Sequence, residues 1–271
     1  MLEIERYGPV HALRQGRAAV GRNALMTVRC YAIDGLLVDC GMPPHRPAVL
    51  DFVAERRVRR VALTHHHEDH SGNARALLEA GLEVAGSPGT RARLVRGFAQ
   101  NFYQVTVWGR TRRADIAGLA DVLETEHHRF EVIAAPGHSV DQVVYFERRE
   151  GWLFSGDAYL GERIKLFRRD EDFRVTLETL RRLTELEIDS IFCAHRPVAT
   201  GGRAALRRKL DYLLELESEV RRLHADGLSV RAVTRRLLGR EDLTTHWLTA
   251  GDASKGNLVR SILFGPTRRE R

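Results

Sequence analysis

The sequence predicts an α/β fold with a helical C-terminal extension, and three observations support this class. Two apolar runs, 28–33 and 36–40, flank Asp34 and Gly35, the residue pair that a type I′ hairpin turn prefers. After this hairpin, short apolar runs typical of buried strands alternate with segments of helical periodicity. From residue 201 onward the pattern is only helical. We therefore predict a catalytic domain over residues 1–200 and a helical extension over residues 201–271 that packs on it.

Each further element follows from a local pattern. Helices are expected where apolar residues recur at three- and four-residue spacing, and strands where a short apolar run lies between turn residues. The expected helices are 47–58, 73–81, 90–102, 173–186, 201–227, 229–239 and 252–265. The expected strands are 59–64, 82–87, 130–134, 142–147, 151–155 and 188–195.

Composition limits the class of protein. The chain has 271 residues, 43% of them apolar, which is enough for a sizeable core. No run approaches the roughly 18 apolar residues of a membrane helix, and the charged start "MLEIERYGPV" does not resemble a secretory signal, so we expect a cytoplasmic protein with no membrane partner. The scattered Cys30, Cys40 and Cys193 indicate buried thiols in a reducing compartment.

The charge balance is basic, with 43 Lys and Arg against 36 Asp and Glu. A basic protein can bind phosphates or RNA. The arginines, however, occur in separate patches beside acidic residues, a pattern more typical of a solvated surface. A nucleic-acid partner is therefore compatible with the sequence but not favoured, and a small-molecule substrate is preferred. A homodimer is equally compatible.

The stretch "LTHHHEDHSGN" concentrates metal-binding side chains at the end of an expected strand. Side chains two residues apart on an extended segment share a face, so His65 and His67 can point at one ion. Asp69 and His70 in the following turn can reach a second ion. Imidazole with carboxylate suits zinc, iron or manganese.

Three more polar residues follow predicted strands further along the chain. They are His138 in "APGHS", Asp157 in "FSGDA" and His195 in "FCAH". With the first cluster they make five histidines and two aspartates. That number of ligands suits two divalent ions that share a carboxylate.

These motifs resemble the metallo-β-lactamase superfamily, whose signature T-H-x-H-x-D-H is present from Thr64 to His70. The G-H-S turn, the G-D strand end and the late histidine follow in the family's order, and the resemblance covers about residues 28–195. It implies an αββα sandwich with the site at one edge of two packed sheets. It also implies two metal sites, one of His65, His67 and His138 and one of Asp69, His70 and His195, with Asp157 bridging them.

The resemblance implies a dinuclear metal-dependent hydrolase that cleaves a small ester, thioester or lactone through a metal-bridging hydroxide. Two Zn²⁺ ions are the preferred cofactors, with iron or manganese as alternatives, and Asp69 is expected to orient or transfer a proton. Three other functions stay open: a metal-dependent ribonuclease or phosphodiesterase, a mononuclear iron dioxygenase of the persulfide type, and a catalytically silent metal-containing binding protein.

Two departures from the family pattern concern the substrate. Ala194 precedes the late histidine where glycine is common, and the surroundings of this histidine differ from those in the thioester-hydrolase branch, glyoxalase II. Tyr159 lies two residues after Asp157, whereas the lactone hydrolases place a tyrosine three residues after it. We keep Tyr159 as a candidate substrate contact.

An aromatic segment is the remaining candidate for substrate selection. Residues 98–108 contain four aromatic residues, and pockets for small substrates are usually lined by such side chains on loops. We predict that Tyr103 and Trp108 form a wall or lid over the metals. The three arginines that follow would be available to an acidic substrate group; they are Arg110, Arg112 and Arg113.

Several neighbours of the motifs are expected to have supporting roles. His66 and Glu68 alternate with the ligands and should face away from the metals, toward the protein or the surface. Asp39 is expected to support the metal loop or to form a simple turn. Lys255 and Asn257 could cap the last helix or reach the pocket, and the cap is preferred.

Overall fold

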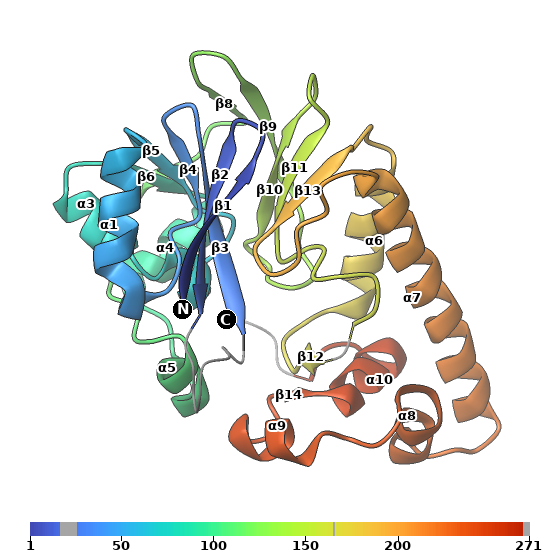
Figure 1. Cartoon of the computed structure of the whole chain (residues 1–271). Coiled ribbons are helices and arrows are strands. Elements are labelled where there is room, and N and C mark those ends of the chain that lie inside the picture. Colours follow the sequence, from blue (N-terminus) through green and yellow to red (C-terminus); the bar gives the residue numbers. More distant parts are fainter. Residues whose placement is uncertain (17–25, 165, 268–271) are drawn as a thin grey trace.

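Two β-sheets pack face to face at the centre of the molecule (Figure 1). This computed structural model describes residues 1–16, 26–164 and 166–267. Within these residues the first sheet has seven strands in chain order: β1 (Leu2–Tyr7), β2 (Val10–Gly16), β3 (Thr27–Ile33), β4 (Leu36–Val38), β5 (Arg60–Ala62), β6 (Glu83–Gly86) and β7 (Ala117–Gly118). In the same ranges the second sheet has five, in the spatial order β13 (Ser190–Cys193), β11 (Trp152–Gly156), β10 (Val143–Glu147), β9 (Arg129–Ala134) and β8 (Val122–Glu124).

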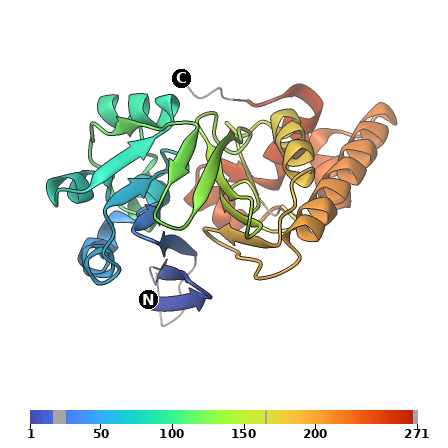
Figure 2. The same ribbon diagram turned by 90° about the horizontal axis from the view of Figure 1, so that it is seen from above.

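Helices cover the outer face of each sheet, as Figure 2 shows from above. The first sheet carries α1 (Arg46–Glu55), α3 (Ala74–Glu79) and α4 (Pro88–Arg96). The second carries α6 (Phe173–Thr184) and the long α7 (Gly202–Ala225). This layering is the predicted αββα sandwich.

Several elements lie at the lower edge of the sandwich in Figure 1. They are α5 (Phe102–Val107), α8 (Val230–Leu238), α9 (Leu243–Leu248), α10 (Lys255–Phe264) and the paired strands β12 (Phe167–Arg168) and β14 (Ala253–Ser254). The remaining short elements are the 3-10 helix η1 (Pro43–His45) and α2 (Glu68–Ser71). No helix of the described residues has the length and apolar character that spanning a membrane requires.

Three apolar clusters hold these layers together. Tyr31, Tyr145, Phe154 and Phe192 pack between the two sheets, where their burial removes large apolar surfaces from water. A second cluster lies between the first sheet and its helices. The third lies between the second sheet, α6, α7 and the last helices, so residues of the C-terminal extension share a core with strands of the sandwich. The division at residue 200 stays a prediction.

Most predicted elements are present, but the structure differs in one predicted helix and has elements that were not expected, among them strands β1, β2, β7 and β8. The hairpin of β3 and β4 turns at Asp34 and Gly35, whose φ angles of 47° and 77° suit the expected turn. The helix expected over 90–102 ends early, at Arg96, because Gly97 at φ 78° ends α4, and a separate helix, α5, begins at Phe102. The short helix α9 was not expected; its cap, Asp242, accepts a hydrogen bond from the Thr244 amide.

Candidate metal centre

The seven predicted ligands come from four segments that meet at one edge of the sandwich. His65 and His67 follow β5, and Asp69 and His70 lie on α2 directly after them. The other three lie at strand ends of the second sheet: His138 between β9 and β10, Asp157 after β11 and His195 after β13. All seven side chains are wholly or largely buried. The topology therefore places ligands from residues 65 to 195 around one point.

The candidate metal-binding atoms form two neighbouring groups. In the first, the Nδ1 atom of His67 lies 2.9 Å from the Nε2 atom of His65 and 3.1 Å from that of His138. In the second, the Nε2 atom of His195 lies 3.4 Å from an oxygen of Asp69, and the Nε2 atom of His70 lies 3.9 Å from the same oxygen.

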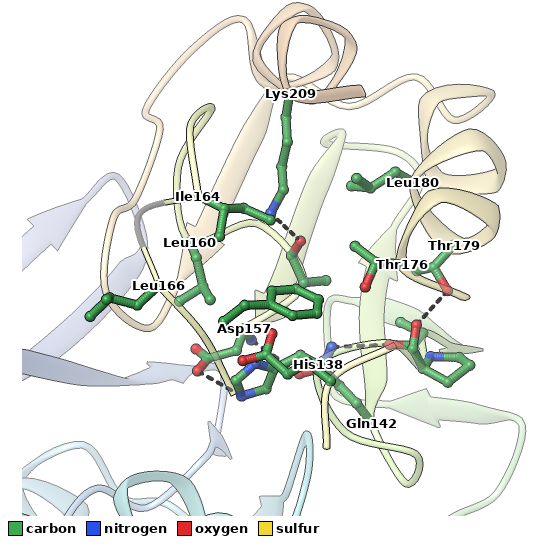
Figure 3. Close-up of a pocket in the computed structure, with 15 residues that line it drawn as sticks. His138, Gln142, Asp157, Leu160, Ile164, Leu166, Thr176, Thr179, Leu180 and Lys209 are labelled. Carbon is green, nitrogen blue, oxygen red and sulfur yellow. Dashed lines mark hydrogen bonds and ion pairs between the residues drawn. The ribbon is translucent and has the colours of Figure 1, made fainter. Parts of the chain in front are cut away.

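Asp157 lies between the two groups. One of its carboxylate oxygens is 3.4 Å from the Nε2 atoms of both His70 and His195, and the other is 3.3 Å from the Nε2 atom of His138. Figure 3 shows the His138 and Asp157 side chains side by side. A carboxylate in this position can bind a metal ion in each of the two groups.

Two hydrogen bonds and one ion-pair contact on the outer ring nitrogens orient three of the histidines. The Nδ1 atom of His70 donates to Asp39 at 2.7 Å, and that of His195 donates to the carbonyl of Thr27 at 2.7 Å. The Nδ1 atom of His138 lies 3.3 Å from a carboxylate oxygen of Glu171. Because carboxylate and carbonyl oxygens accept and do not donate, the Nδ1 atoms of His70 and His195 each carry a proton, and their inward Nε2 is the nitrogen that can bind a metal.

Asp39 has the supporting position that the sequence suggested. Its carboxylate also accepts hydrogen bonds from the amide of Thr64, at 2.8 Å, and from the Thr64 hydroxyl. It therefore joins the start of the histidine loop to His70. The residue adopts φ 59°, an uncommon angle outside glycine, which directs its side chain to this point.

The charges of the cluster are strongly coupled. Burial disfavours a charged His70, but Asp157, Asp39 and Asp69 outweigh it and raise the pKa of His70 well above its ordinary value. Burial also disfavours ionised Asp157, yet His195 and His70 lower the pKa of Asp157 well below its usual range. For His65, burial and the neighbouring His70 and His138 lower the pKa well below 6.5. The carboxylates of the site thus favour positive charge at its centre.

These residues fit divalent metal ions. The Nε2 atom of His70 and the Oδ1 atom of Asp157 are among the buried atoms that make no hydrogen bond within the described residues. A buried polar atom without a partner is costly, and coordination of a cation removes that cost. Metal–ligand distances of about 2.0–2.2 Å put tetrahedral ligands about 3.3 Å apart, close to the separations around Asp157.

His66 and Glu68 face away from the ligand cluster, as predicted, but neither is on the surface. The amide and the Nδ1 atom of His66 both contact the Asp141 carboxylate, at 3.0 and 2.9 Å. Asp141 also accepts a hydrogen bond from Thr90 at 2.7 Å, and its pKa is held far below the usual range because these bonds outweigh burial. Asp141 therefore fixes the backbone between His65 and His67.

A second polar group surrounds the outer side of His67. The Nη1 atom of Arg168 lies 3.1 Å from the Nε2 atom of His67, and its Nη2 atom donates to Asp170 at 3.1 Å. His67 is therefore in contact with a charged group on β12, next to the C-terminal extension.

Glu68 lies on the adjoining helix α2. Burial and the neighbouring Asp69 raise the pKa of Glu68 to about 7.

The predicted substrate residues lie at different depths. Tyr103 donates a hydrogen bond from its hydroxyl to Asp252 at 2.7 Å, which joins α5 to the turn after α9. Tyr159 is only 4% exposed and belongs to the core that includes α7. Trp108 is 8% exposed and packs against Val28, Met42 and Ala194, with its ring centroid 6.1 Å from that of His195. Trp108 is therefore fixed by packing beside the site. It can form part of a wall of the site, but it is not an exposed lid.

We expect Trp108→Ala to lower the free energy of unfolding by about 3–5 kcal/mol, because the change empties a packed aromatic site. Urea unfolding measures this loss. Trp108→Phe keeps most of the volume and should fold, so it tests the wall: KM should rise while metal content stays unchanged. Unchanged kinetics in the phenylalanine variant would restrict Trp108 to packing.

Sequence patterns missed Asp141, Glu171, Arg168 and Lys209. Asp141 lies three residues after His138, and this short separation in the sequence was the only signal that could have indicated its role. Lys209 on α7 is 2% exposed. Its Nζ atom donates to the carbonyl of Ala158 at 3.0 Å (Figure 3), and also to that of Tyr159, in the turn after Asp157.

The predicted cap by Lys255 and Asn257 is wrong, because Ser254 caps the last helix: its side chain accepts a hydrogen bond from the Asn257 amide at 3.0 Å. The Lys255 ammonium instead donates to the carbonyl of Leu238 at the end of α8, and the Asn257 side chain donates to the carbonyl of Asp252.

A small cavity adjoins the ligands on the side of α6 and α7. It has a volume of about 30 Å³ and is bordered by His138, Asp157, Phe167, Leu180 and Lys209, several of which Figure 3 labels. That volume holds one or two water molecules and no substrate. The cavity is therefore a site for water behind the ligands and not the place where a substrate binds.

Comparison with known proteins identifies the class. The family model of the metallo-beta-lactamase superfamily matches residues 26–195, which is more than half of the chain. The chain therefore belongs to this superfamily and is a metal-dependent hydrolase. The ligand-bearing segments all lie inside the matched range.

Two curated relatives carry the same name. The chain is 29% identical over 218 residues to a hydroxyacylglutathione hydrolase of Rhodobacter capsulatus, covering 78% of this chain and 77% of the relative. It is 26% identical over 174 residues to a hydroxyacylglutathione hydrolase of Salmonella enteritidis, covering 61% of this chain and 56% of the relative. The chain thus spans between about half and three quarters of these relatives.

Solved structures show the same fold. A metallo-beta-lactamase family protein of Thermus thermophilus superposes with a TM-score of 0.68 at 21% identity, over 94% of this chain and 93% of that one. A beta-lactamase domain protein of Burkholderia ambifaria superposes with a TM-score of 0.70 at 19% identity, over 97% and 89%. Both superpositions include most of the C-terminal extension, because they cover more than nine tenths of this chain.

Proposed function

We propose that this hydrolase uses two divalent metal ions to cleave a small thioester, ester or lactone, with a thioester preferred. The observation that carries this proposal is the convergence of five imidazoles and two carboxylates, with Asp157 within 3.4 Å of three histidines from different segments. The relatives named hydroxyacylglutathione hydrolase support the thioester class.

The ligand geometry supports one ion on His65, His67 and His138 and another on Asp69, His70 and His195, with Asp157 between them. Zinc is the preferred metal, and iron or manganese fits the same ligands. Two such ions would supply Lewis acidity, which brings the pKa of a coordinated water toward about 7 and polarises the attacked carbonyl.

The residues of the chain have separate tasks in this hydrolysis. Water adds to the carbonyl carbon, the carbon–sulfur bond breaks, and the departing thiolate takes up the proton that the water loses. The Asp69 carboxylate lies 3.4 Å from the Nε2 atom of His195, within the site, and is placed to hold and pass on that proton. Arg168 and Asp141 keep His67 and its backbone in position.

Metal analysis followed by a substrate panel tests this function. The metal-loaded protein is assayed with a hydroxyacylglutathione thioester, an aryl ester, a homoserine lactone, an aryl phosphodiester and single-stranded RNA, with Asp157→Ala as the blank. We expect about two metal ions per chain and the highest kcat/KM for the thioester. RNA binding should be weak and should fall steeply with salt, because it rests on counterion release alone.

Three results would contradict the proposal. Metal-dependent RNA or phosphodiester cleavage that exceeds the activity on all three acyl substrates would favour the nuclease. One iron per chain with oxygen consumption on a persulfide would favour the dioxygenase. Full metal content without turnover of any substrate in the panel would favour a binding protein.

A further inference from the structure

A basic cleft lies between the end of α4 and the segment that follows α5. Its volume is about 490 Å³, within the range of small-molecule pockets, and its walls are residues 94–100 and parts of 105–113. Gln100 ties the two walls together: its side-chain nitrogen donates to the carbonyl of Gly109 at 3.0 Å, and its oxygen accepts from the amide of Thr111 at 2.9 Å. The cleft is therefore closed at one side by specific bonds.

Three of the four arginines of this cleft lack the carboxylate partners that many other arginines of the described residues have. Four guanidinium groups line it, from Arg96, Arg110, Arg112 and Arg113, and none of the lining residues is acidic. Arg112 makes an ion pair with Glu79 at 3.4 Å. For the other three, no carboxylate of residues 1–16, 26–164 and 166–267 lies within ion-pair distance. Many surface arginines of this chain do pair, such as Arg91 with Asp115 at 3.1 Å and Arg208 with Glu162 at 2.7 Å.

Like charges in one cleft repel one another, and an anion relieves that repulsion. The lining also includes apolar side chains: buried Leu94 and half-buried Phe98 and Val105. A ligand that contacts both the arginines and the apolar side chains of the cleft has a negative charge and an apolar or aromatic group. A long polyanion suits the cleft less well, since its basic residues surround one hollow and do not extend along a track.

The cleft also adjoins the metal loop. The ring of Phe98 contacts the ring of His66 edge-on, with centroids 4.8 Å apart. His66 in turn is bonded to Asp141 and lies between the ligands His65 and His67. A molecule in the cleft would therefore lie directly behind the histidine loop, separated from it by one aromatic ring.

We propose that this cleft binds a small organic anion, an apolar or aromatic group that carries a phosphate or a carboxylate. Phe98, Leu94 and Val105 contact the apolar part, and Arg96, Arg110 and Arg113 contact the anionic part. This binding site is separate from the metal ligands and does not depend on the proposed thioester hydrolysis.

Calorimetric titration of the metal-loaded protein tests this site. The probes are 1-naphthyl phosphate, 1-naphthoate, inorganic phosphate and neutral 1-naphthol. We expect one of the two naphthyl anions to bind more tightly than both inorganic phosphate and naphthol, and the better one identifies the anionic group. Binding should weaken with added salt, because the guanidinium groups are exposed.

The double variant Arg110→Ala/Arg113→Ala should weaken binding of that probe tenfold or more, with an unchanged melting temperature, since both side chains are exposed. Arg208→Ala, an exposed arginine on α7, is the matched control and should bind as wild type. Asp157→Ala, expected to lose metal, should also keep binding. Equal affinity in the double variant, loss of binding in Asp157→Ala, or no preference for naphthyl anions over naphthol would each overturn the proposal.

Discussion

Asp157→Ala is expected to remove bound metal and lower turnover about a thousandfold or more. Asp157 is the carboxylate that contacts three histidines from both ligand groups. Metal ions supply several kcal/mol of transition-state stabilisation, and each 1.36 kcal/mol is a factor of ten in rate. Elemental analysis of the purified protein and initial rates on the thioester measure the two effects.

The fold should survive this change. Asp157 lies in a loop after β11, and the aromatic cluster between the sheets does not include it. We expect the metal-free variant to melt near metal-free wild type. Asp115→Ala, which removes an exposed carboxylate paired with Arg91, is the matched control and should keep metal and activity. Wild-type metal content in Asp157→Ala would refute a bridging role.

Lys209→Met should weaken metal binding although Lys209 contacts no ligand. Its buried ammonium donates to Ala158 and Tyr159, the two residues that follow Asp157, and burial lowers the pKa of Lys209 to about 8. Methionine is similar in length but removes both donors, so the turn that positions Asp157 is no longer held. Groups that orient ligands typically change metal affinity about 10–100-fold.

Competition with a metal-sensing chelator measures that affinity, and kcat should fall only as far as metal is lost. Arg208→Met is the control, because the neighbouring Arg208 is exposed on the same helix and pairs with Glu162. If Lys209→Met binds metal as wild type does, Lys209 only fills the core. If it fails to fold, Lys209→Arg, which keeps the donors, should restore metal affinity.

The candidate metal ligands were accessible from local patterns. The spacing of His65, His67, Asp69 and His70 is short, and an extended segment followed by a turn has few ways to place such side chains. His138, Asp157 and His195 each follow an apolar run, and polar residues at strand ends collect at a sheet edge. Local patterns also determined the hairpin at Asp34 and Gly35, because that pair adopts positive φ readily.

Contacts between distant residues were not accessible in this way. Thr27 orients His195, Glu171 contacts His138 and Lys209 holds the turn after Asp157, and each of these contacts joins residues between 33 and 168 positions apart in sequence. Periodicity describes which face of one element is buried, but it does not say which other element covers that face. The same limit applied to Trp108, whose surroundings looked exposed in sequence but are buried by Val28, Met42 and Ala194.

The sequence by itself thus determined the kind of chemistry, since metal ligands are specified by residue type and short spacing. The tertiary structure decided how those ligands are held, which aromatic residues are fixed in the core, and where unpaired arginines meet in one cleft. The physical reason is that the orientation of a side chain and the balance of its charge depend on neighbours brought close by packing.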